Sequence, residues 1–283
     1  MRCLGNNLKI TIDNVTLCYH EEGPDEAPVV IFIHGFPFNK SMWDSQMDVL
    51  KEHYRVIAYD IRGHGNSDAG KEHFSIDLFV KDLIGMMDHL LIDRAVLCGL
   101  SLGGYIALTA IDKYPERFDA LILSDTQCIA DSPEMKGKRM KAIAGIQENG
   151  VATYVEESIK HLFAPASFTT NKSAVNAVRG MMEKTAAASL CSTLKALSER
   201  NETCDTLEKI AVPVLILVGK EDTVTPPAAA AFMHEKIQGS FLYTIEHAGH
   251  VANMENPSEF NKQLIQFADR FAKTAAAPHR LGT

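Results

Sequence analysis

Residues 95–106 of the chain read AVLCGLSLGGYI. The apolar run 95–98 is typical of a short buried strand, and the residues from 102 onward are typical of a helix. A serine between two glycines at such a junction has the spacing of a nucleophile elbow, which would hold the hydroxyl of Ser101 clear of the backbone. Gly99 and Gly103 lack Cβ atoms, so strand and helix can approach closely. The helix N-terminus offers N–H groups where an anion would develop. The pattern therefore predicts that Ser101 is a catalytic nucleophile.

A nucleophilic serine needs a base, and two histidines near the end of the chain are candidates. His250 follows the last predicted strand, residues 241–245. Gly249 before it allows the chain to turn so that the imidazole can face the serine. His247 lies in the same loop and is the alternative. The order Ala-Gly-His favours His250 as the general base.

The base in turn needs a carboxylate that orients it and stabilises its protonated form. Asp222 follows the predicted strand 212–218, and a loop beyond the carboxyl end of a strand can meet a neighbouring loop. Glu221 stands next to it, and Asp125 follows the predicted strand 120–123. The sequence favours Asp222 for this role and leaves these two acids as alternatives.

The loop after the apolar run 29–33 is a candidate oxyanion hole, which needs two converging N–H groups. One would be the backbone N–H of Leu102, directly after the nucleophile. The other would be that of Phe36, because Pro37 has no N–H. His34 in this loop is interpreted as a residue that shapes the loop.

The glycine-rich residues 60–67, DIRGHGNS, match no phosphate-binding pattern and predict a structural turn with a hydrogen-bond network around Arg62.

Strand and helix patterns alternate in the first and last parts of the chain, which predicts a mostly parallel, doubly wound sheet with helices on both faces. The stretch 126–207 shows helical patterns and no convincing strand. We expect it to form a helical cap over the sheet that excludes water and shapes the pocket; a separate helical domain is the alternative.

The expected core is residues 1–125 and 208–274, and residues 275–283 form a frayed tail. The expected strands are 8–12, 15–20, 29–33, 55–59, 95–98, 120–123, 212–218 and 241–245. We expect one helix to begin near residue 41, two others to span 76–91 and 102–114, one to follow residues 226–227, and a last one to span 256–272.

Composition narrows the class of protein further. Hydrophobic residues make up 46% of the 283 residues, enough for a sizeable core, and the net charge is −8. This acidic excess argues against nucleic acid and anionic membrane surfaces as partners, although a local pocket could accept a small anionic substrate. No apolar run approaches the roughly 20 residues of a membrane-spanning helix. The six cysteines are scattered, which predicts a reduced, soluble, cytoplasmic protein without a cysteine metal site. The oligomeric state is left open, a homodimer included.

These segments together resemble the α/β-hydrolase superfamily, and they occur in the order that family shows. The matching pieces are residues 34–37, the Asp60-x-Arg62-Gly63-x-Gly65-x-Ser67 turn, residues 99–104, Asp222-x-x-Thr225-Pro226 and Gly249-His250. Within the superfamily the chain is similar to 3-oxoadipate enol-lactonases and small carboxylesterases. Residues 41–46, 62–65 and 98–104 carry this closer resemblance.

The resemblance implies a serine hydrolase that cleaves a carboxylic ester or lactone through an acyl-enzyme on Ser101, with no metal or organic cofactor. Cofactor-free perhydrolases and carbon–carbon bond hydrolases share the same triad and are alternatives. Carbon–carbon bond hydrolases usually have Gly-Pro-Gly where this chain has Phe36-Pro37-Phe38, which disfavours them. Haloalkane dehalogenases and epoxide hydrolases have aspartate at the position of Ser101. A non-enzymatic ligand receptor on the same scaffold is a third reading.

Overall fold

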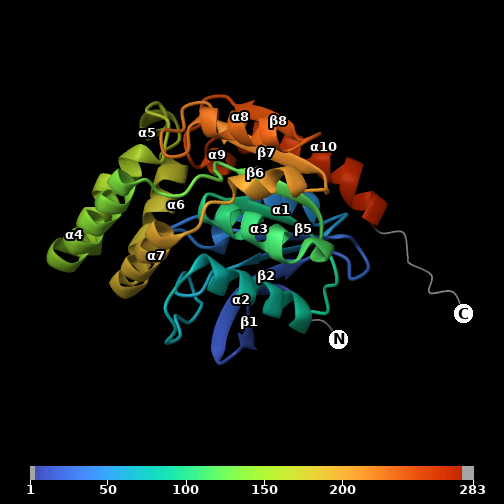
Figure 1. Ribbon diagram of the computed structural model, residues 1–283, viewed down its shortest axis with the longest axis horizontal. Helices are drawn as coiled ribbons and strands as arrows, with labels where there is room; N and C mark the ends of the chain where they lie inside the picture. Colours follow the sequence, from blue (N-terminus) through green and yellow to red (C-terminus); the bar gives the residue numbers. More distant parts are fainter. Residues whose placement is uncertain (1–3, 276–283) are drawn as a thin grey trace, which may run out of the picture.

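The computed structural model describes residues 4–275 and contains one eight-stranded sheet (Figure 1). Its spatial order is β1-β2-β4-β3-β5-β6-β7-β8. The first two strands pair antiparallel with each other, β2 pairs antiparallel with β4, and all later pairs are parallel. The expected mostly parallel, doubly wound architecture is confirmed. The strands are β1 (Gly5–Ile12), β2 (Val15–Glu22), β3 (Val29–Ile33), β4 (Arg55–Tyr59), β5 (Ala95–Leu100), β6 (Phe118–Ser124), β7 (Val214–Gly219) and β8 (Phe241–Ile245).

Helices cover both faces of this sheet. Alternate side chains of a strand point to opposite faces, and β3 shows this directly. Ile31 and Ile33 join one apolar cluster with the helices α2 and α3, whereas Val30 and Phe32 join another with α1 and α10. Central strands such as β5 are therefore buried along their whole length, as parallel strands covered on two sides must be. The helices are α1 (Asp44–Leu50), α2 (Ile76–His89), α3 (Leu102–Lys113), α4 (Pro133–Ser158), α5 (Ser167–Thr170), α6 (Lys172–Glu183), α7 (Ala187–Glu199), α8 (Pro227–Lys236), α9 (Ala252–Glu255) and α10 (Pro257–Ala275).

Most expected bounds differ from the structure by one to three residues at an end, and two further details differ. The helix expected from Ser41 starts instead as a 3-10 helix, Lys40–Trp43, whose cap is the side chain of Asn39, and α1 begins only at Asp44. The short helix α9 was not expected, because four residues are too few to show a helical period. The tail expected at 275–283 lies outside the described residues except for Ala275, which ends α10.

The chain between β6 and β7 forms helices α4 to α7, which stand beside the sheet at the left of Figure 1. The long helix α4 is broken at Gly150, whose φ of 82° is readily adopted only by glycine. The helical character expected for this stretch is therefore present. Its boundaries at 126 and 207, and its role as a cap, stay predictions.

A disulfide joins Cys128 to Cys204, with their Cα atoms 4.9 Å apart and a sequence separation of 76. The expectation that all cysteines are reduced is wrong for this pair. One lies where the chain leaves β6 and the other where it returns towards β7, so the fold brings together cysteines whose spacing showed no pattern. Disulfides persist mainly in oxidising compartments, which removes the basis for expecting a cytoplasmic location. Cys18, Cys98 and Cys191 are free thiols.

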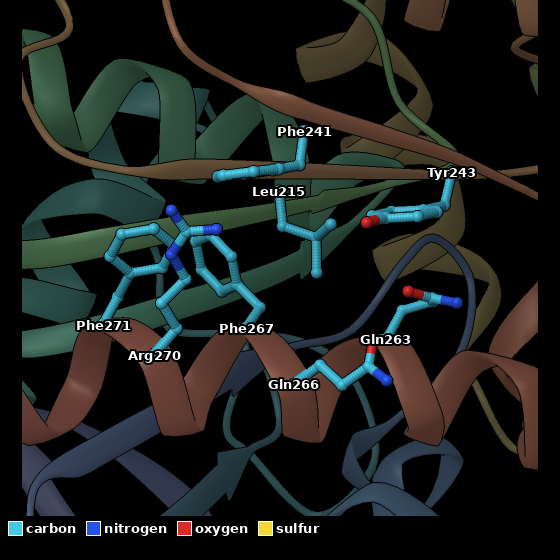
Figure 2. A pocket seen from close by; sticks show the side chains of 8 residues that line it. All are labelled: Leu215, Phe241, Tyr243, Gln263, Gln266, Phe267, Arg270 and Phe271. Carbon is cyan, nitrogen blue, oxygen red and sulfur yellow. The ribbon is translucent and has the colours of Figure 1, made fainter.

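The last helix, α10, packs along the edge strand β8 and leaves a groove of about 220 Å³ between them (Figure 2). Phe241, Phe267 and Phe271 gather around the side chain of Arg270 there, whose guanidinium lies 5.2 Å from the Phe241 ring centre. None of the candidate catalytic residues lines this groove. No helix within residues 4–275 combines the length and apolar character that crossing a membrane requires.

Candidate active site

Ser101 stands on a strained turn between β5 and α3. Its φ of 52° and ψ of −110° are unusual for a residue with a side chain. Two close backbone approaches leave room only for glycine at positions 99 and 103. A Cβ on Gly99 would collide with the backbone of Gly103, and a Cβ on Gly103 would collide with the carbonyl oxygen of Ile33. The Ser101 amide donates to the Ser124 carbonyl (3.0 Å), which fixes the turn to β6. The local geometry is that of the predicted nucleophile elbow.

His250 and Asp222 come from the two loops that follow β8 and β7, and both are buried. Their atoms Nδ1 and Oδ2 are 2.8 Å apart. An ionised carboxylate can only accept, so Nδ1 carries the proton and Nε2 is left as the basic nitrogen. Thr225 also holds the carboxylate, because its hydroxyl donates to Oδ2 (2.8 Å) and its amide to Oδ1 (3.1 Å). The sequence marked Thr225 as part of the family motif that begins at Asp222, but assigned it no role.

Ser101 and His250 line the same cavity, which has a volume of about 200 Å³. Asp222 lies behind His250 and does not line it. Phe36 from the loop after β3 also lines the cavity, and Leu102 is the first residue of α3. The structure thus gathers residues predicted from four separate segments, while the oxyanion role of the Phe36 and Leu102 amides stays a prediction.

The electrostatics of the pair suit a general base. Burial alone would lower the pKa of His250, but the charge and the hydrogen bond of Asp222 raise it above the usual 6.5. Burial would raise the pKa of Asp222, but His250 and then Thr225 hold it below the ordinary value of 3.8. Asp222 therefore stays ionised at neutral pH, and its charge stabilises the protonated form of His250.

The alternative acids and base occupy different places. Asp125 is buried, but it accepts from the Gly219 amide (2.8 Å) and from the neighbouring Ser124 hydroxyl. Burial, together with the charge of Asp222, raises the pKa of Asp125 to about 8. Glu221 and His247 are both exposed to solvent. The hydrogen bond to His250 therefore favours Asp222 among the three acids.

His34 and Arg62 have the structural surroundings that the sequence suggested. The Ile61 amide donates to Nε2 of buried His34 (2.9 Å), so its Nδ1 donates to the Gly35 carbonyl (2.8 Å) and two loops are joined. Buried Arg62 donates to both carboxylate oxygens of Asp82 (2.8 and 2.6 Å). These side chains fix the loops behind the cavity.

Glu255 at the end of α9 binds the histidine loop to the helical stretch, and sequence reasoning missed it. Its carboxylate accepts from the amides of Gly249 (2.6 Å) and Ala164 (2.9 Å) and from the Ser167 hydroxyl (2.8 Å). The His250 amide also donates to the carbonyl of Leu162 (2.8 Å). The candidate base is thus anchored by the segment between α4 and α6.

Helices α4 to α7 and the turn after α4 supply much of the cavity wall, and sequence reasoning had assigned them no site residues. The side chains from this part are those of Arg139, Tyr154, Ser158, His161, Leu162, Met182 and Leu197. They are spread over separate helices at spacings that any packed helix shows, so no sequence signal marks them. Within residues 4–275 no group of His, Cys, Asp and Glu side chains is arranged to hold a metal ion.

Known proteins resemble this chain over most of its length. The family model described as alpha/beta hydrolase fold matches residues 28–257. A 3-oxoadipate enol-lactonase from Acinetobacter baylyi is 30% identical over 262 residues, which cover 93% of this chain and 96% of that protein. A non-heme chloroperoxidase from Burkholderia pyrrocinia is 30% identical over 272 residues, 91% of this chain and 97% of its own. A thermophilic esterase from Thermogutta terrifontis, solved with malate bound, matches with a TM-score of 0.88 and 30% identity, covering 93% and 98% of the two chains.

Proposed function

The chain belongs to the α/β-hydrolase family, and we propose that it is a serine hydrolase that cleaves a carboxylic ester or a lactone. The observation that carries this proposal is the arrangement of Ser101, His250 and Asp222. The serine stands on a strained turn and shares a cavity with a histidine, whose Nδ1 is hydrogen-bonded to a buried carboxylate. The names of the relatives, a lactonase and an esterase, support the same reaction class.

In the proposed reaction, Ser101 Oγ attacks the substrate carbonyl while His250 Nε2 takes the hydroxyl proton. Asp222 holds the imidazole in the required tautomer and stabilises its protonated form. The amides of Phe36 and Leu102 donate to the developing oxyanion. His250 then gives its proton to the leaving alkoxide, and the acyl group remains on Ser101. Water attacks this ester with His250 as base, which releases the acid and restores the serine.

The helices α4 to α7 act in this proposal as a cap that shapes the pocket for a small-molecule substrate. They cover the cavity with side chains from α4, α6 and α7. A lining that excludes water strengthens electrostatic interactions at the reacting atoms. Substrate choice within the ester and lactone class would then depend on this cap more than on the sheet.

The test is hydrolysis of a panel of p-nitrophenyl esters and simple lactones by the unchanged protein and by Ser101→Ala. We expect turnover that falls by at least about 10³-fold in the variant, because the nucleophile is lost while folding is preserved. Equal melting temperatures of the two proteins are the control for folding. Full activity of the variant would refute the proposed mechanism.

A second candidate reaction is perhydrolysis, which the similarity to the non-heme chloroperoxidase favours. Hydrogen peroxide would replace water in the attack on the acyl-enzyme and release a peracid. Peracid formation from acetate and peroxide, absent in Ser101→Ala, would identify this activity. Ester hydrolysis without peracid formation would exclude it.

A further inference from the structure

The two outer strands of the sheet differ in how their open edges are protected. β1 pairs only with β2, and β8 pairs only with β7. β1 has a register irregularity between Gly5 and Leu8 and carries Lys9. Bulges and lysines are devices that keep an edge strand from pairing with another chain. β8 reads FLYTI and has no lysine, proline or register irregularity, so its edge is open to a further strand.

The ladder between β7 and β8 shows which backbone groups of β8 face outward. The Ile245 carbonyl accepts from the amide of Lys220, directly after β7 (2.9 Å). Along a strand, the residues whose N–H and C=O groups point to one neighbour alternate with those that point to the other side. The odd-numbered residues of β8 therefore bond β7, whereas Leu242 and Thr244 direct their N–H and C=O groups away from the sheet.

Beyond the end of β8 the next outward groups already have partners. The Glu246 amide donates to Oε2 of Glu259 (3.1 Å), and the Glu246 carbonyl accepts from Nδ2 of Asn256 (3.0 Å). Within residues 4–275 no such partner meets the outward groups of Leu242 and Thr244. The unsatisfied part of the edge is thus confined to two residues, with two N–H and two C=O groups.

A second copy of β8 is complementary to all four of these groups. When the copies run antiparallel with Tyr243 opposite Tyr243, Leu242 of each copy lies opposite Thr244 of the other. Each of these two pairs exchanges two hydrogen bonds. Tyr243, which is 42% exposed, then lies on the two-fold axis, in the non-hydrogen-bonded position where opposite side chains are closest. Such a contact uses the same surface of both copies.

The charges along this edge also suit a second copy. Helix α10 runs opposite to β8: Glu259 near its start binds the Glu246 amide, and Arg270 near its end lies over the Phe241 ring (Figure 2). Lys220 balances Glu246, but neither Glu259 nor Arg270 has an ion pair within residues 4–275. Antiparallel pairing brings Arg270 of each copy towards Glu259 of the other. This charge complementarity favours a second copy over an unrelated extended segment.

We propose that two copies of the chain associate through β8, antiparallel and centred on Tyr243, as a homodimer with one continuous sheet. Four backbone hydrogen bonds, the contact of the two tyrosine rings and two pairs of Arg270 with Glu259 hold the copies together. None of the candidate catalytic residues lines the groove beside β8. The proposal is therefore independent of the proposed function.

The first test is sedimentation equilibrium from nanomolar to high micromolar concentrations, for the unchanged protein and for Thr244→Pro. We expect a dimer that dissociates on dilution. The proline removes one outward N–H from each copy and so two of the four hydrogen bonds, which should raise the dimer Kd by about 100-fold. An edge strand tolerates a proline whose N–H would face away from the sheet.

The matched control is Thr11→Pro on the opposite edge of the sheet. Ile12 and Val15 form the hydrogen-bonded pair that closes the two-residue turn between β1 and β2, so the Thr11 amide also faces outward. This variant should keep the dimer Kd of the unchanged protein. A protein that is monomeric at every concentration would overturn the proposal and leave the edge to another kind of partner. An equal Kd for Thr244→Pro and the unchanged protein would overturn it as well.

A second test locates the two-fold axis and does not depend on the proline variants. Tyr243→Cys places two thiols opposite each other on the axis, so mild oxidation should give a covalent dimer. Phe232→Cys on α8, where the side chain is 36% exposed, is the control and should give no more covalent dimer than the unchanged protein. Equal yields from the two cysteine variants would contradict the proposed axis. Melting temperatures show which variants are folded.

Charge reversal tests the antiparallel direction. Arg270→Glu and Glu259→Lys should each dimerise more weakly than the unchanged protein, because like charges then meet at both ends of the contact. An equimolar mixture of the two variants should regain the dimer, since each mixed pair contains two contacts between opposite charges. A mixture that associates as weakly as the separate variants would contradict the proposed arrangement.

Discussion

His250 determines the pH at which the proposed reaction becomes efficient. Its pKa lies above 6.5 because the charge and hydrogen bond of Asp222 outweigh burial. Only the neutral imidazole accepts the serine proton, so kcat/KM should rise with pH through a midpoint above 6.5. The raised pKa also stabilises the folded protein, but with the opposite dependence on pH. This stabilisation is present below pH 6.5 and is lost as pH rises through the pKa of His250 in the folded protein.

Asp222→Asn tests the cause of this midpoint. Without the negative charge, burial of His250 is no longer opposed by its main partner, and the midpoint should move to lower pH. The amide also favours the wrong imidazole tautomer, so kcat should fall by about 10⁴-fold. The measurement is a pH profile of ester hydrolysis for both proteins. An unshifted midpoint would show that Asp222 does not control the base.

Asp125→Asn should behave differently, although this residue is also a buried acid near His250. Its pKa of about 8 means that it is mostly uncharged at neutral pH, and an amide can still accept from the Gly219 amide. Activity at neutral pH should stay within about threefold. The pKa of Asp125 is higher in the folded protein than in the unfolded protein. Asp125 therefore lowers the free energy of unfolding as pH rises from 3.8 to about 8. Melting temperatures across this range should fall less steeply in the variant; equal slopes, or lost activity, would contradict this account.

At this scale the sequence indicated which candidate site residues the fold brings together better than it indicated the residues around them. Ser101 and His250 stand beside glycines at the ends of strands, where the required turn leaves a sequence pattern. Arg139 carries no such pattern, because it reaches the cavity only through the packing of α4 against other helices. Glu255 acts through contacts with residues 164–167, about 90 positions away in the chain, which spacing cannot reveal.

At the scale of elements, the disulfide between Cys128 and Cys204 stabilises the join between the helical stretch and the sheet. Closing a loop of this length restricts the unfolded chain, which should be worth about 2–4 kcal/mol. Cys128→Ser/Cys204→Ser should therefore melt about 5–10 °C lower in a thermal scan. Cys191→Ser, which alters a free thiol, is the control. A dithiol reductant should lower the melting temperature of the unchanged protein and leave the double variant as it is; equal effects on both would contradict this role.

Strands were more predictable than helices from their residues. The expected bounds of β3, β4 and β8 are those of the structure. For β3 the reason is that a buried parallel strand is a continuous apolar run, here residues 29–33, with polar or glycine residues after it. The long helix α4 has a weaker pattern. Only two side chains of the long α4, Ile146 and Val155, are buried, so its sequence gives little indication of what it covers.

Across the whole molecule, the net charge differs from the charges of the side chains that line the cavity. The net charge of −8 describes the outer surface and supports the expectation that nucleic acid is not a partner. The cavity lining, in contrast, includes Arg139 and His161 and, among the described residues, no aspartate or glutamate. Composition counts every residue equally, so it cannot show which charged side chains the fold brings to one cavity.

The disulfide between Cys128 and Cys204 also gives the helices between the two cysteines a fixed attachment beside the sheet. The chain leaves β6 at its carboxyl end and enters β7 at its amino end, and the two strands pair directly, in parallel, from Leu121 and Val214 onward. Strand register is therefore independent of how many residues lie between the two cysteines. A helical segment of different length, grafted between them, could replace much of the pocket wall and leave the sheet in place, provided that it kept the contacts of Leu162, Ala164 and Ser167 that hold the His250 loop. The sheet would then be the constant part of the molecule and the helical stretch its variable part.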